Sequence, residues 1–465
     1  MTIIRLFSDI RLWIMVLFVL RLIHITQAPL EVAHNWRQTT VTMVARNFLE
    51  VDNNIFYPRL DIAGEKTGIT GMEFPLLNYL IYLLSLLFGY AHWYGRLIVL
   101  IISSIASFLF YKTVKKNFDE GVAFKATFIL LVSLWFSYSR KIMPDVFSLS
   151  FIVMSLYYAT VYFENKRMLD ILLFLFFACI GTLSKLTSGY LLVLLVLFLF
   201  KDGVSVKTKI IFSALFILSI IPALWWYFQW VPYVTEANDF KHFFMGMDIG
   251  EGALEIKDHL ALTLKRFYDT AMKYSGFAVF VVGFAFMLIK RQKLLLFIFF
   301  LPLGAFLVVI FKAGYGFSRH TYYILPFVPV MAIVAAYGLN QLKNSRLVVL
   351  VLTVVATENI IAQLPDFRVN DTHVGLLHLE SDLDKIAQPQ DLILINSTNY
   401  PTPMYFAHHK GWIESNEKIQ DEKYISELKS KGLKHIVVLK KAFGSEVKLT
   451  YKTVLENEDY CIYSL

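Results

Sequence analysis

The sequence predicts an α-helical polytopic membrane protein with a small α/β domain at its C-terminal end. Two observations predict the membrane part: the 465 residues are 57% hydrophobic and 17% charged, and long apolar runs such as 172–200 and 294–311 recur. Soluble domains carry about 25% charged residues. A third observation predicts the α/β part, because the composition becomes polar and mixed over residues 366–465. We therefore expect domains at 1–365 and 366–465.

The net charge of +8 does not indicate nucleic-acid binding. Many Lys and Arg residues lie in short connections between apolar runs, where they orient a membrane protein. Cys179 and Cys461 are expected to be unpaired, and neither has metal-site spacing. The N-terminus opens an apolar segment without a cleavage signal, which predicts a retained anchor.

Eleven apolar segments are long enough, or nearly so, to cross a bilayer. They are residues 10–26, 95–113, 122–139, 145–163, 168–184, 186–200, 209–230, 275–289, 294–311, 320–339 and 346–363.

The charges of the connections predict the orientation. The connections at 112–117, 164–167, 201–209, 289–293 and 342–346 are basic, which places them in the cytoplasm by the positive-inside rule. The opposite, outer side of the membrane would then receive the first loop at 27–94, three shorter turns, a loop at 231–274 and the C-terminal domain.

One more apolar run, residues 75–90, is ambiguous. Arg5 and Arg11 are also expected in the cytoplasm. The number of spans then agrees with cytoplasmic basic connections only if this run does not cross the membrane. Pro75 suits the first turn of a helix, and we expect this helix to lie along the outer membrane surface. The alternative is a twelfth span, which would place Asp145 inside.

The C-terminal residues show the pattern of a small α/β domain. Strands are expected at 390–397 and 434–441, a helix at 421–432 that ends at Gly432, and a strand or hairpin at 450–465. The histidines of His408-His409-Lys410 could bind a ligand, but adjacent histidines in a turn are more often solvated.

Ionisable residues gather near the predicted outer ends of the helices, where such groups mark a cavity or a functional site. The acids are Glu73, before Pro75, and Asp145, in the turn Ser139–Asp145. The other members of this set are Arg37, Arg46, Arg96, Arg140, Lys141, Lys185, Arg319 and His320. Each has an ordinary alternative: a cation can extend to the membrane surface, and Asp145 can cap its helix.

Together, these residues suit transfer of a group from a lipid phosphate. An acid can deprotonate an acceptor hydroxyl or hold a divalent metal. Cations can bind the phosphate that leaves and offset its charge.

The sequence also resembles the GT-C superfamily of membrane glycosyltransferases, in the bacterial branch related to protein O-mannosyltransferases and to the aminoarabinose transferase of lipid A. The matching motifs over 1–365 are WRQTTVTMVARNF (36–48), YPRLD (57–61), EFPLLNYLIYLLSLLFG (73–89), GRL (95–97), RKIMPDVFSLSF (140–151), LSKLTSGYL (183–191) and HTYYILPFVPVMA (320–332).

The resemblance implies a helical core whose first outer loop carries two juxtamembrane helices, the second matching 75–90. It implies a polyprenyl-phosphate sugar as donor and direct transfer with inversion. A divalent metal (Mg, Mn or Zn) near Glu73 and Asp145 is also implied. Glu73 matches the acid of the E-x-P motif, Asp145 matches the second-loop acid, and Lys185 matches a turn that supplies a positively charged residue in relatives.

The sequence departs from this family at one point. Relatives place an acid near the start of the first juxtamembrane helix, where this chain has Thr39 and Thr40. Threonine cannot act as a base at neutral pH. Glu31, His34 or Glu73 could take the role, the loop could be arranged differently, or the chain could be inactive; we favour Glu73 or Asp145.

The expected function is transfer of a sugar to an envelope acceptor (glycan, lipid or protein) on the outer, periplasmic or extracellular side. The donor phosphate would be bound by Lys185, Arg140, Arg37, Arg96, Arg319 and His320. The alternatives are a non-catalytic binding or assembly protein of the same fold and a transporter of lipid-linked material. The expected partners include membrane lipid but no nucleic acid.

Overall fold

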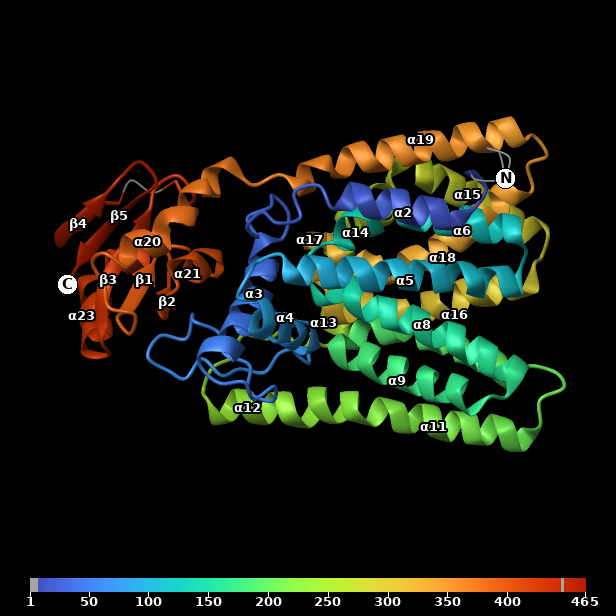
Figure 1. Cartoon of the computed structure of the whole chain (residues 1–465), viewed down its shortest axis with the longest axis horizontal. Helices are drawn as coiled ribbons and strands as arrows, with labels where there is room; N and C mark the ends of the chain where they lie inside the picture. Colours follow the sequence, from blue (N-terminus) through green and yellow to red (C-terminus); the bar gives the residue numbers. More distant parts are fainter. Residues whose placement is uncertain (1–6, 445–446) are drawn as a thin grey trace. The chain divides into compact units, whose positions relative to one another are not determined.

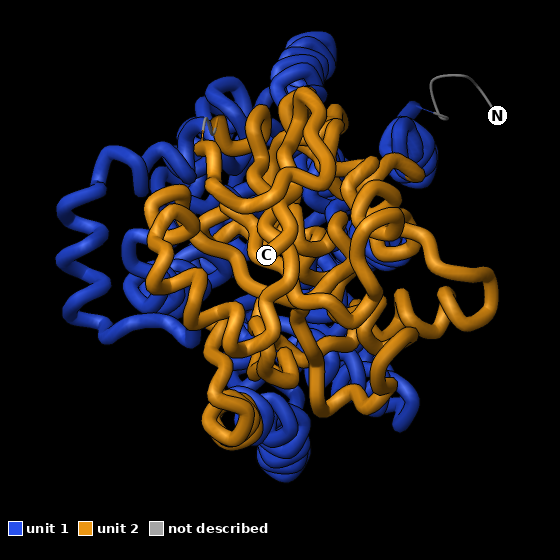
Figure 2. Tube along the Cα trace, turned by 90° about the vertical axis from the view of Figure 1, so that its left-hand side faces the viewer, with its two compact units in different colours: residues 1–25, 96–227, 244–365 blue, residues 26–95, 228–243, 366–465 orange. Residues whose placement is uncertain are grey.

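A computed structural model describes residues 7–444 and 447–465, which form two compact units (Figure 2). The first unit contains residues 1–25, 96–227 and 244–365. The second contains residues 26–95, 228–243 and 366–465. The second unit therefore joins the first predicted loop to the C-terminal region. The predicted domain limits at 365 and 366 stay a prediction.

The first unit is a helical bundle (Figure 1). Its longer helices are α2 (Ile10–Arg21), α5 (Tyr94–Asn117), α6 (Glu120–Val132), α8 (Pro144–Asn165), α9 (Met168–Ser184), α11 (Val206–Trp225), α13 (Ile249–Asp258), α15 (Lys273–Ile289), α16 (Lys293–Ala313), α18 (Val328–Asn340) and α19 (Ser345–Gln363). Shorter helical pieces are α7 (Trp135–Tyr138), η1 (Leu186–Leu195), α10 (Val196–Leu199), η2 (Trp226–Trp230), α14 (Leu260–Lys265), η3 (Arg266–Thr270), α17 (Tyr315–Arg319) and η4 (Thr321–Phe327).

Small residues let these helices approach closely. A Cβ atom on Gly283 of α15 would lie 2.1 Å from the carbonyl oxygen of Val334 in α18. A Cβ atom on Gly338 would lie 2.4 Å from the Cα atom of Gly283. The two helices therefore pack backbone against backbone, as small residues allow in membrane bundles.

Six helices among the described residues are long and apolar enough to cross a membrane, or seven if the bent pair Leu260–Thr270 and Lys273–Ile289 is one span. The chain is thus a multi-pass membrane protein. Every one of the eleven predicted segments contains a helix, but the helical pieces in 10–26, 122–139, 168–184 and 186–200 are shorter than these six. The count of eleven spans stays a prediction.

The run at 75–90 forms α4 (Leu76–Phe88), a helix of 13 residues. At about 1.5 Å per residue it is roughly 20 Å long, too short for a hydrocarbon core of about 30 Å. Leu87 and Phe88 are 73% and 72% exposed, so α4 presents an apolar end outside its own unit's core. Its length argues against the twelfth span, and its position on the membrane surface stays a prediction.

The second unit is built on a five-stranded sheet with the order β2-β1-β3-β5-β4. The strands are β1 (Leu392–Ile395), β2 (Gly411–Ile413), β3 (Leu433–Leu439), β4 (Lys452–Glu456) and β5 (Tyr460–Ser464). Strands β2 and β3 pair parallel with β1, while β3–β5 and β5–β4 are antiparallel. The predicted strands and the hairpin are confirmed.

The helices of this unit are α3 (Asn35–Glu50), α4, α12 (Val231–Ala237), η5 (Leu364–Phe367), η6 (Asp371–His378), α20 (Leu379–Leu383), α21 (Thr402–Ala407), α22 (Asn416–Ile419) and α23 (Glu422–Ser430). Ile425 and Leu428 of α23 pack on one face of the sheet. The other face shares a hydrophobic core with Met43, Val44 and Phe48 of α3. Alternate residues of each strand point to opposite faces, so the first loop and the C-terminal sheet fold as one body.

The expectation that both histidines are solvated is wrong for His409, whereas the side chain of His408 is 34% exposed. His409 is 3% exposed, and its Nδ1 lies 2.8 Å from the carbonyl oxygen of Ala407. His408 lies between two carboxylates, with Nδ1 2.5 Å from Glu380 and Nε2 2.8 Å from Glu50. Hydrogen bonds to Glu380 and Glu50 raise the pKa of His408 to about 9. The hydrogen bond from His408 also lowers the pKa of Glu380.

We expect this cluster to make the stability of the second unit depend on pH. Because the pKa of His408 in the folded state is about 9, its stabilisation is complete below about pH 6.5 and is lost as pH rises through about 9. Because the pKa of Glu380 is lowered, the stabilisation that this carboxylate contributes is lost as pH falls below the ordinary pKa of a glutamate. His408→Gln should therefore lower the melting temperature most between about pH 5 and pH 8.

Tryptophan fluorescence of the detergent-solubilised protein measures that temperature. The exposed His378 provides the matched control, and His378→Gln should leave the pH profile of the wild type unchanged. Equal melting temperatures for wild type and His408→Gln across this range would contradict the prediction.

Candidate active site

In the first unit, Asp145 and Lys185 form a buried ion pair. Asp145 lies in the first turn of α8, after Pro144, where the helix dipole favours a carboxylate. Lys185 ends α9 and precedes η1. The Nζ atom of Lys185 lies 2.6 Å from Oδ1 of Asp145, and their side chains are 11% and 4% exposed.

Two further groups extend this cluster. The Nζ atom of Lys185 lies 4.9 Å from the centre of the Tyr322 ring, and the His320 ring stacks on Tyr322 with centroids 5.3 Å apart. The hydroxyl of Ser148 donates to the carbonyl of Gly181 at 2.7 Å, which ties α8 to α9 near the ion pair. The structure therefore brings together Asp145, Lys185 and His320, with Tyr322 as the link that the sequence did not single out.

The second oxygen of Asp145 is the unusual atom of this cluster. Oδ2 is buried and accepts no hydrogen bond from the described residues. A buried carboxylate oxygen without a donor is costly, since such groups are normally hydrogen-bonded. This atom is a natural acceptor for a proton or for a donor on a bound molecule.

The buried arginines of this unit bind backbone carbonyls. Arg140 donates to the carbonyls of Ile23 at 2.6 Å and His24 at 3.1 Å. Arg96 donates to the carbonyl of Ile25 at 3.0 Å. These carbonyls follow the end of α2, where a helix leaves acceptors unsatisfied. Both arginines hold the chain after α2, and a phosphate-binding role for them stays a prediction.

Two other predicted residues differ in exposure. Arg319 is exposed, and its guanidinium lies 4.6 Å from the centre of the Tyr315 ring. Lys141 is 1% exposed, and its Nζ lies 5.6 Å from the centre of the Tyr138 ring. Of these two cations, only Arg319 is open to a ligand from solvent without movement of the fold.

A cavity of about 510 Å³ is lined by residues close to Lys185 in the sequence, although Lys185 itself does not line it. Thr182, Leu186 and Gly189, which flank Lys185 in the sequence, line one side of it. Phe212, Phe216 and other apolar residues of α11 line another side. The cavity is thus an apolar space that starts within a few residues of a buried cation.

In the second unit, Glu73 pairs with Arg37. The Nη2 atom of Arg37 lies 2.6 Å from Oε1 of Glu73, with side chains 14% and 9% exposed. His242 is a half-buried neighbour that the sequence did not single out. Burial and the charge of Arg37, against the opposing effect of Glu73, lower the pKa of His242 to about 4. It is therefore a neutral imidazole at neutral pH.

The residues around the start of α3 are buried and hydrogen-bonded at the place where relatives were expected to carry an acid. Thr39 is fully buried, and its hydroxyl lies 3.1 Å from the carbonyl of Asn35 and 3.0 Å from the hydroxyl of Thr402. Glu31 is 1% exposed and accepts a hydrogen bond from Gln38 at 2.9 Å. His34 precedes α3 with a left-handed backbone, φ +58°, and is half-buried. The position of the expected acid is thus occupied by a packing contact.

The described residues contain no group of three or more His, Cys, Asp or Glu side chains that could hold a metal ion. Each of the two predicted metal ligands, Glu73 and Asp145, instead pairs with a cation. This donor set does not fit a metal, and we derive no step through one.

The chain shares the fold of solved structures of ArnT and of an archaeal oligosaccharyltransferase, which confirms the expected resemblance at the level of the fold. Residues 73–226 match the family model described as dolichyl-phosphate-mannose-protein mannosyltransferase. No curated protein matches the chain.

Two solved structures carry the comparison. ArnT from Cupriavidus metallidurans bound to undecaprenyl phosphate is 12% identical, with a TM-score of 0.62 over 97% of this chain and 98% of that chain. The oligosaccharyltransferase of Archaeoglobus fulgidus in the apo form is 13% identical, with a TM-score of 0.55 over 92% of this chain and 69% of that chain.

We expect the Asp145–Lys185 pair to be coupled in stability. Asp145→Leu or Lys185→Met alone leaves one buried charge without its partner, which costs about 3–5 kcal/mol, whereas removal of both charges is often near neutral. The double variant should therefore recover most of the loss. Titration with a denaturing detergent measures the free energy of unfolding, and additive losses would contradict the coupling.

Proposed function

We propose that the chain is a glycosyltransferase that moves a sugar from a polyprenyl-phosphate donor to an envelope acceptor. The observation that carries the proposal is the buried Asp145, which holds Lys185 through Oδ1 while Oδ2 has no hydrogen-bond donor among the described residues. A carboxylate oxygen without a hydrogen-bond donor can take a proton from an acceptor hydroxyl.

The proposed reaction is a direct displacement. The acceptor oxygen forms a bond to the anomeric carbon while the bond from that carbon to the phosphate oxygen breaks, and the configuration inverts. The bonding electrons leave with the phosphate, and the hydroxyl proton passes to a carboxylate. Lys185 has three N–H donors and can hold Asp145 while it offsets charge on the phosphate.

Asp145 and Glu73 are the two proposed bases, and His34 is a third candidate. Glu73 forms an ion pair with Arg37. His320 and Arg319 are proposed to bind the donor phosphate with Lys185, and His320 reaches this cluster through the Tyr322 ring. Arg96 and Arg140 of the first unit are proposed to take part in the same binding, and the same role for Arg37 of the second unit stays a prediction.

The apolar cavity beside Lys185 supports a lipid-linked donor. A polyprenyl chain is a long apolar ligand, and its burial is favourable in proportion to the apolar area removed from water. The chain would extend along Leu186 and Gly189 towards α11, with its phosphate at Lys185. The ligands in two structures of the same fold are of this class: undecaprenyl phosphate in ArnT and dolichol-phosphate in AglB from Archaeoglobus fulgidus.

We further propose that the reaction takes place on the outer side of a bacterial inner membrane. The five basic connections support this orientation through the positive-inside rule, because Asp145 and Lys185 lie at the helix ends opposite to those connections.

A second function, a non-catalytic protein of the same fold, is favoured by one observation. The hydroxyl of Thr39 bonds to Thr402 at the position where relatives carry an acid. This alternative predicts that the protein binds the lipid-linked sugar without turnover.

Transfer from polyprenyl-phosphate sugars by the purified protein tests the proposal. Asp145→Asn and Glu73→Gln should each reduce kcat by about 10²–10⁴-fold, the usual contribution of a general base, if that residue is the base. If both residues act in one step, the double variant should reduce kcat by less than the product of the two single fold reductions.

Matched controls are available for both acids. Asp170 is a buried carboxylate in the first turn of α9, and Glu65 is an exposed acid in the first loop. Asp170→Asn and Glu65→Gln should leave kcat unchanged. Unchanged transfer by the Asp145→Asn/Glu73→Gln double variant would remove both acids from the mechanism, and donor binding without turnover by the wild type would favour the non-catalytic alternative.

A further inference from the structure

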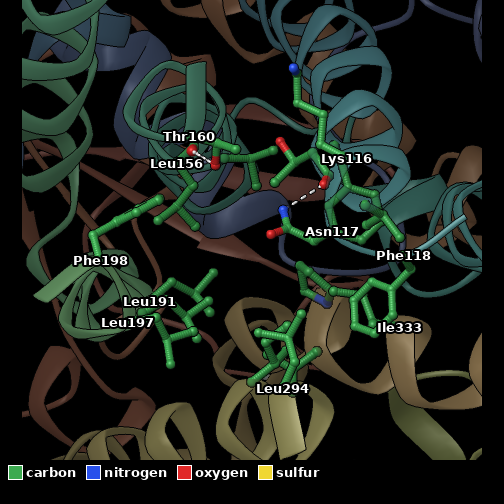
Figure 3. Close-up of a pocket in the computed structure, with 18 of the residues that line it drawn as sticks. Lys116, Asn117, Phe118, Leu156, Thr160, Leu191, Leu197, Phe198, Leu294 and Ile333 are labelled. Atoms are coloured by element: carbon green, nitrogen blue, oxygen red, sulfur yellow. Dashed lines mark hydrogen bonds between the residues drawn. The ribbon is translucent and has the colours of Figure 1, made fainter. Parts of the chain in front are cut away.

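The first unit contains a second cavity, of about 350 Å³, that the proposed reaction does not use (Figure 3). It lies between α5, α8, η1, α10, α16 and α18. Leu156, Thr160 and Glu164 of α8 line it, whereas Asp145 lies at the other end of that helix. At about 1.5 Å per residue, Glu164 lies roughly 28 Å along α8 from Asp145. The cavity is therefore separate from the ion pair.

Its interior is apolar and its rim is charged. Leu191, Leu197 and Phe198 form one side, Leu294 and Ile333 form another, and the side chain of Asn117 points into the space between them (Figure 3). Lys116 pairs with Glu164 at the rim, and the exposed Lys201 also lines the cavity. The charged lining residues are thus two lysines and one glutamate.

Basic connections surround this rim. The connections that supply Lys116, Glu164 and Lys201 are residues 112–117, 164–167 and 201–209. Together they hold eight Lys or Arg side chains and two acidic ones. The cavity therefore has two chemically distinct ends. Its interior is lined by apolar side chains, and its rim carries mainly positive charge.

We propose that this cavity binds an anionic phospholipid of the surrounding membrane. One acyl chain occupies the apolar interior between Leu197 and Ile333, and the phosphate lies at the rim near Lys201 and Asn117. Basic pockets between membrane helices bind anionic head groups, each nearby Lys or Arg contributing about 1 kcal/mol. A volume of about 350 Å³ lies within the range of small-molecule sites, roughly 300–1,000 Å³.

Charge selects this occupant over a neutral or zwitterionic lipid. An apolar chain alone would be bound equally well from any lipid, because the hydrophobic effect is not directional. The excess of positive charge at the rim favours a head group with a net negative charge. The ligand is therefore distinguished by its head group and not by its acyl chains.

Thermal unfolding of the full-length protein in a neutral detergent tests the proposal, with dioleoyl phosphatidylglycerol and dioleoyl phosphatidylcholine as probes of equal chain length. Phosphatidylglycerol should raise the melting temperature at lower concentration than phosphatidylcholine. Lys201→Gln should raise the half-saturating concentration of phosphatidylglycerol about fivefold, which corresponds to about 1 kcal/mol. Leu197→Trp, which fills the interior, should abolish stabilisation.

Two matched variants make the result specific. Lys207→Gln removes an exposed lysine of the same connection that does not line the cavity, and Val349→Trp adds the same bulk on the exposed face of α19. Val349→Trp should respond to phosphatidylglycerol as the wild type does, and Lys207→Gln should raise the half-saturating concentration less than Lys201→Gln does. Equal stabilisation by the two lipids, or the same shift from Lys207→Gln as from Lys201→Gln, would overturn the proposal.

Retention of lipid provides a readout that does not depend on folding energy. Native mass spectrometry of the wild type should show bound phosphatidylglycerol after exchange into detergent, and Leu197→Trp should show none at an unchanged melting temperature in the absence of lipid. If Leu197→Trp is too unstable to purify, Lys201→Gln alone decides the outcome through its loss of head-group selectivity.

Discussion

Burial of charge is the constraint on which the helical unit depends. A charged group removed from water needs a partner, and each buried cation discussed for this unit has an identifiable one. Arg140 and Arg96 bind the carbonyls after α2, and Lys185 binds Asp145. These contacts fix how α2, α5 and the turn before α8 meet, so the same residues that suggest a site also determine local structure.

The fold was largely predictable because its main signals are local. Apolar runs located the long apolar helices of the bundle, whereas α13, α14 and α17 lie in segments that were expected to be loops. Strand patterns located β1 and β3, and alternation located the C-terminal hairpin. Strand β2 was not predicted, since three residues give too little pattern. The length of several helices was also misjudged, because breaks such as that between α6 and α7 leave no gap in hydropathy.

The candidate site was predictable only in part. The residue types at 145 and 185 suggested a shared role, and the structure joins them at 2.6 Å. The partners of His408, Thr39 and His242 come from distant parts of the chain, so sequence spacing carried no signal for them. Nor could the sequence distinguish an arginine that binds a ligand from one that binds a carbonyl, since both are arginines beside apolar runs.

The shared core of α3 and the sheet has a consequence for biosynthesis. Thr39 and Thr402 are 363 positions apart, and all of the described helical bundle except α2 is encoded between them. At roughly 5–20 residues per second, the ribosome needs about 20–70 s to make that stretch. Throughout this time Met43, Val44 and Phe48 lack the sheet against which they pack. The first loop therefore completes its folding after translation of the last strands, and a truncated nascent chain would expose an apolar helix face to chaperones and proteases.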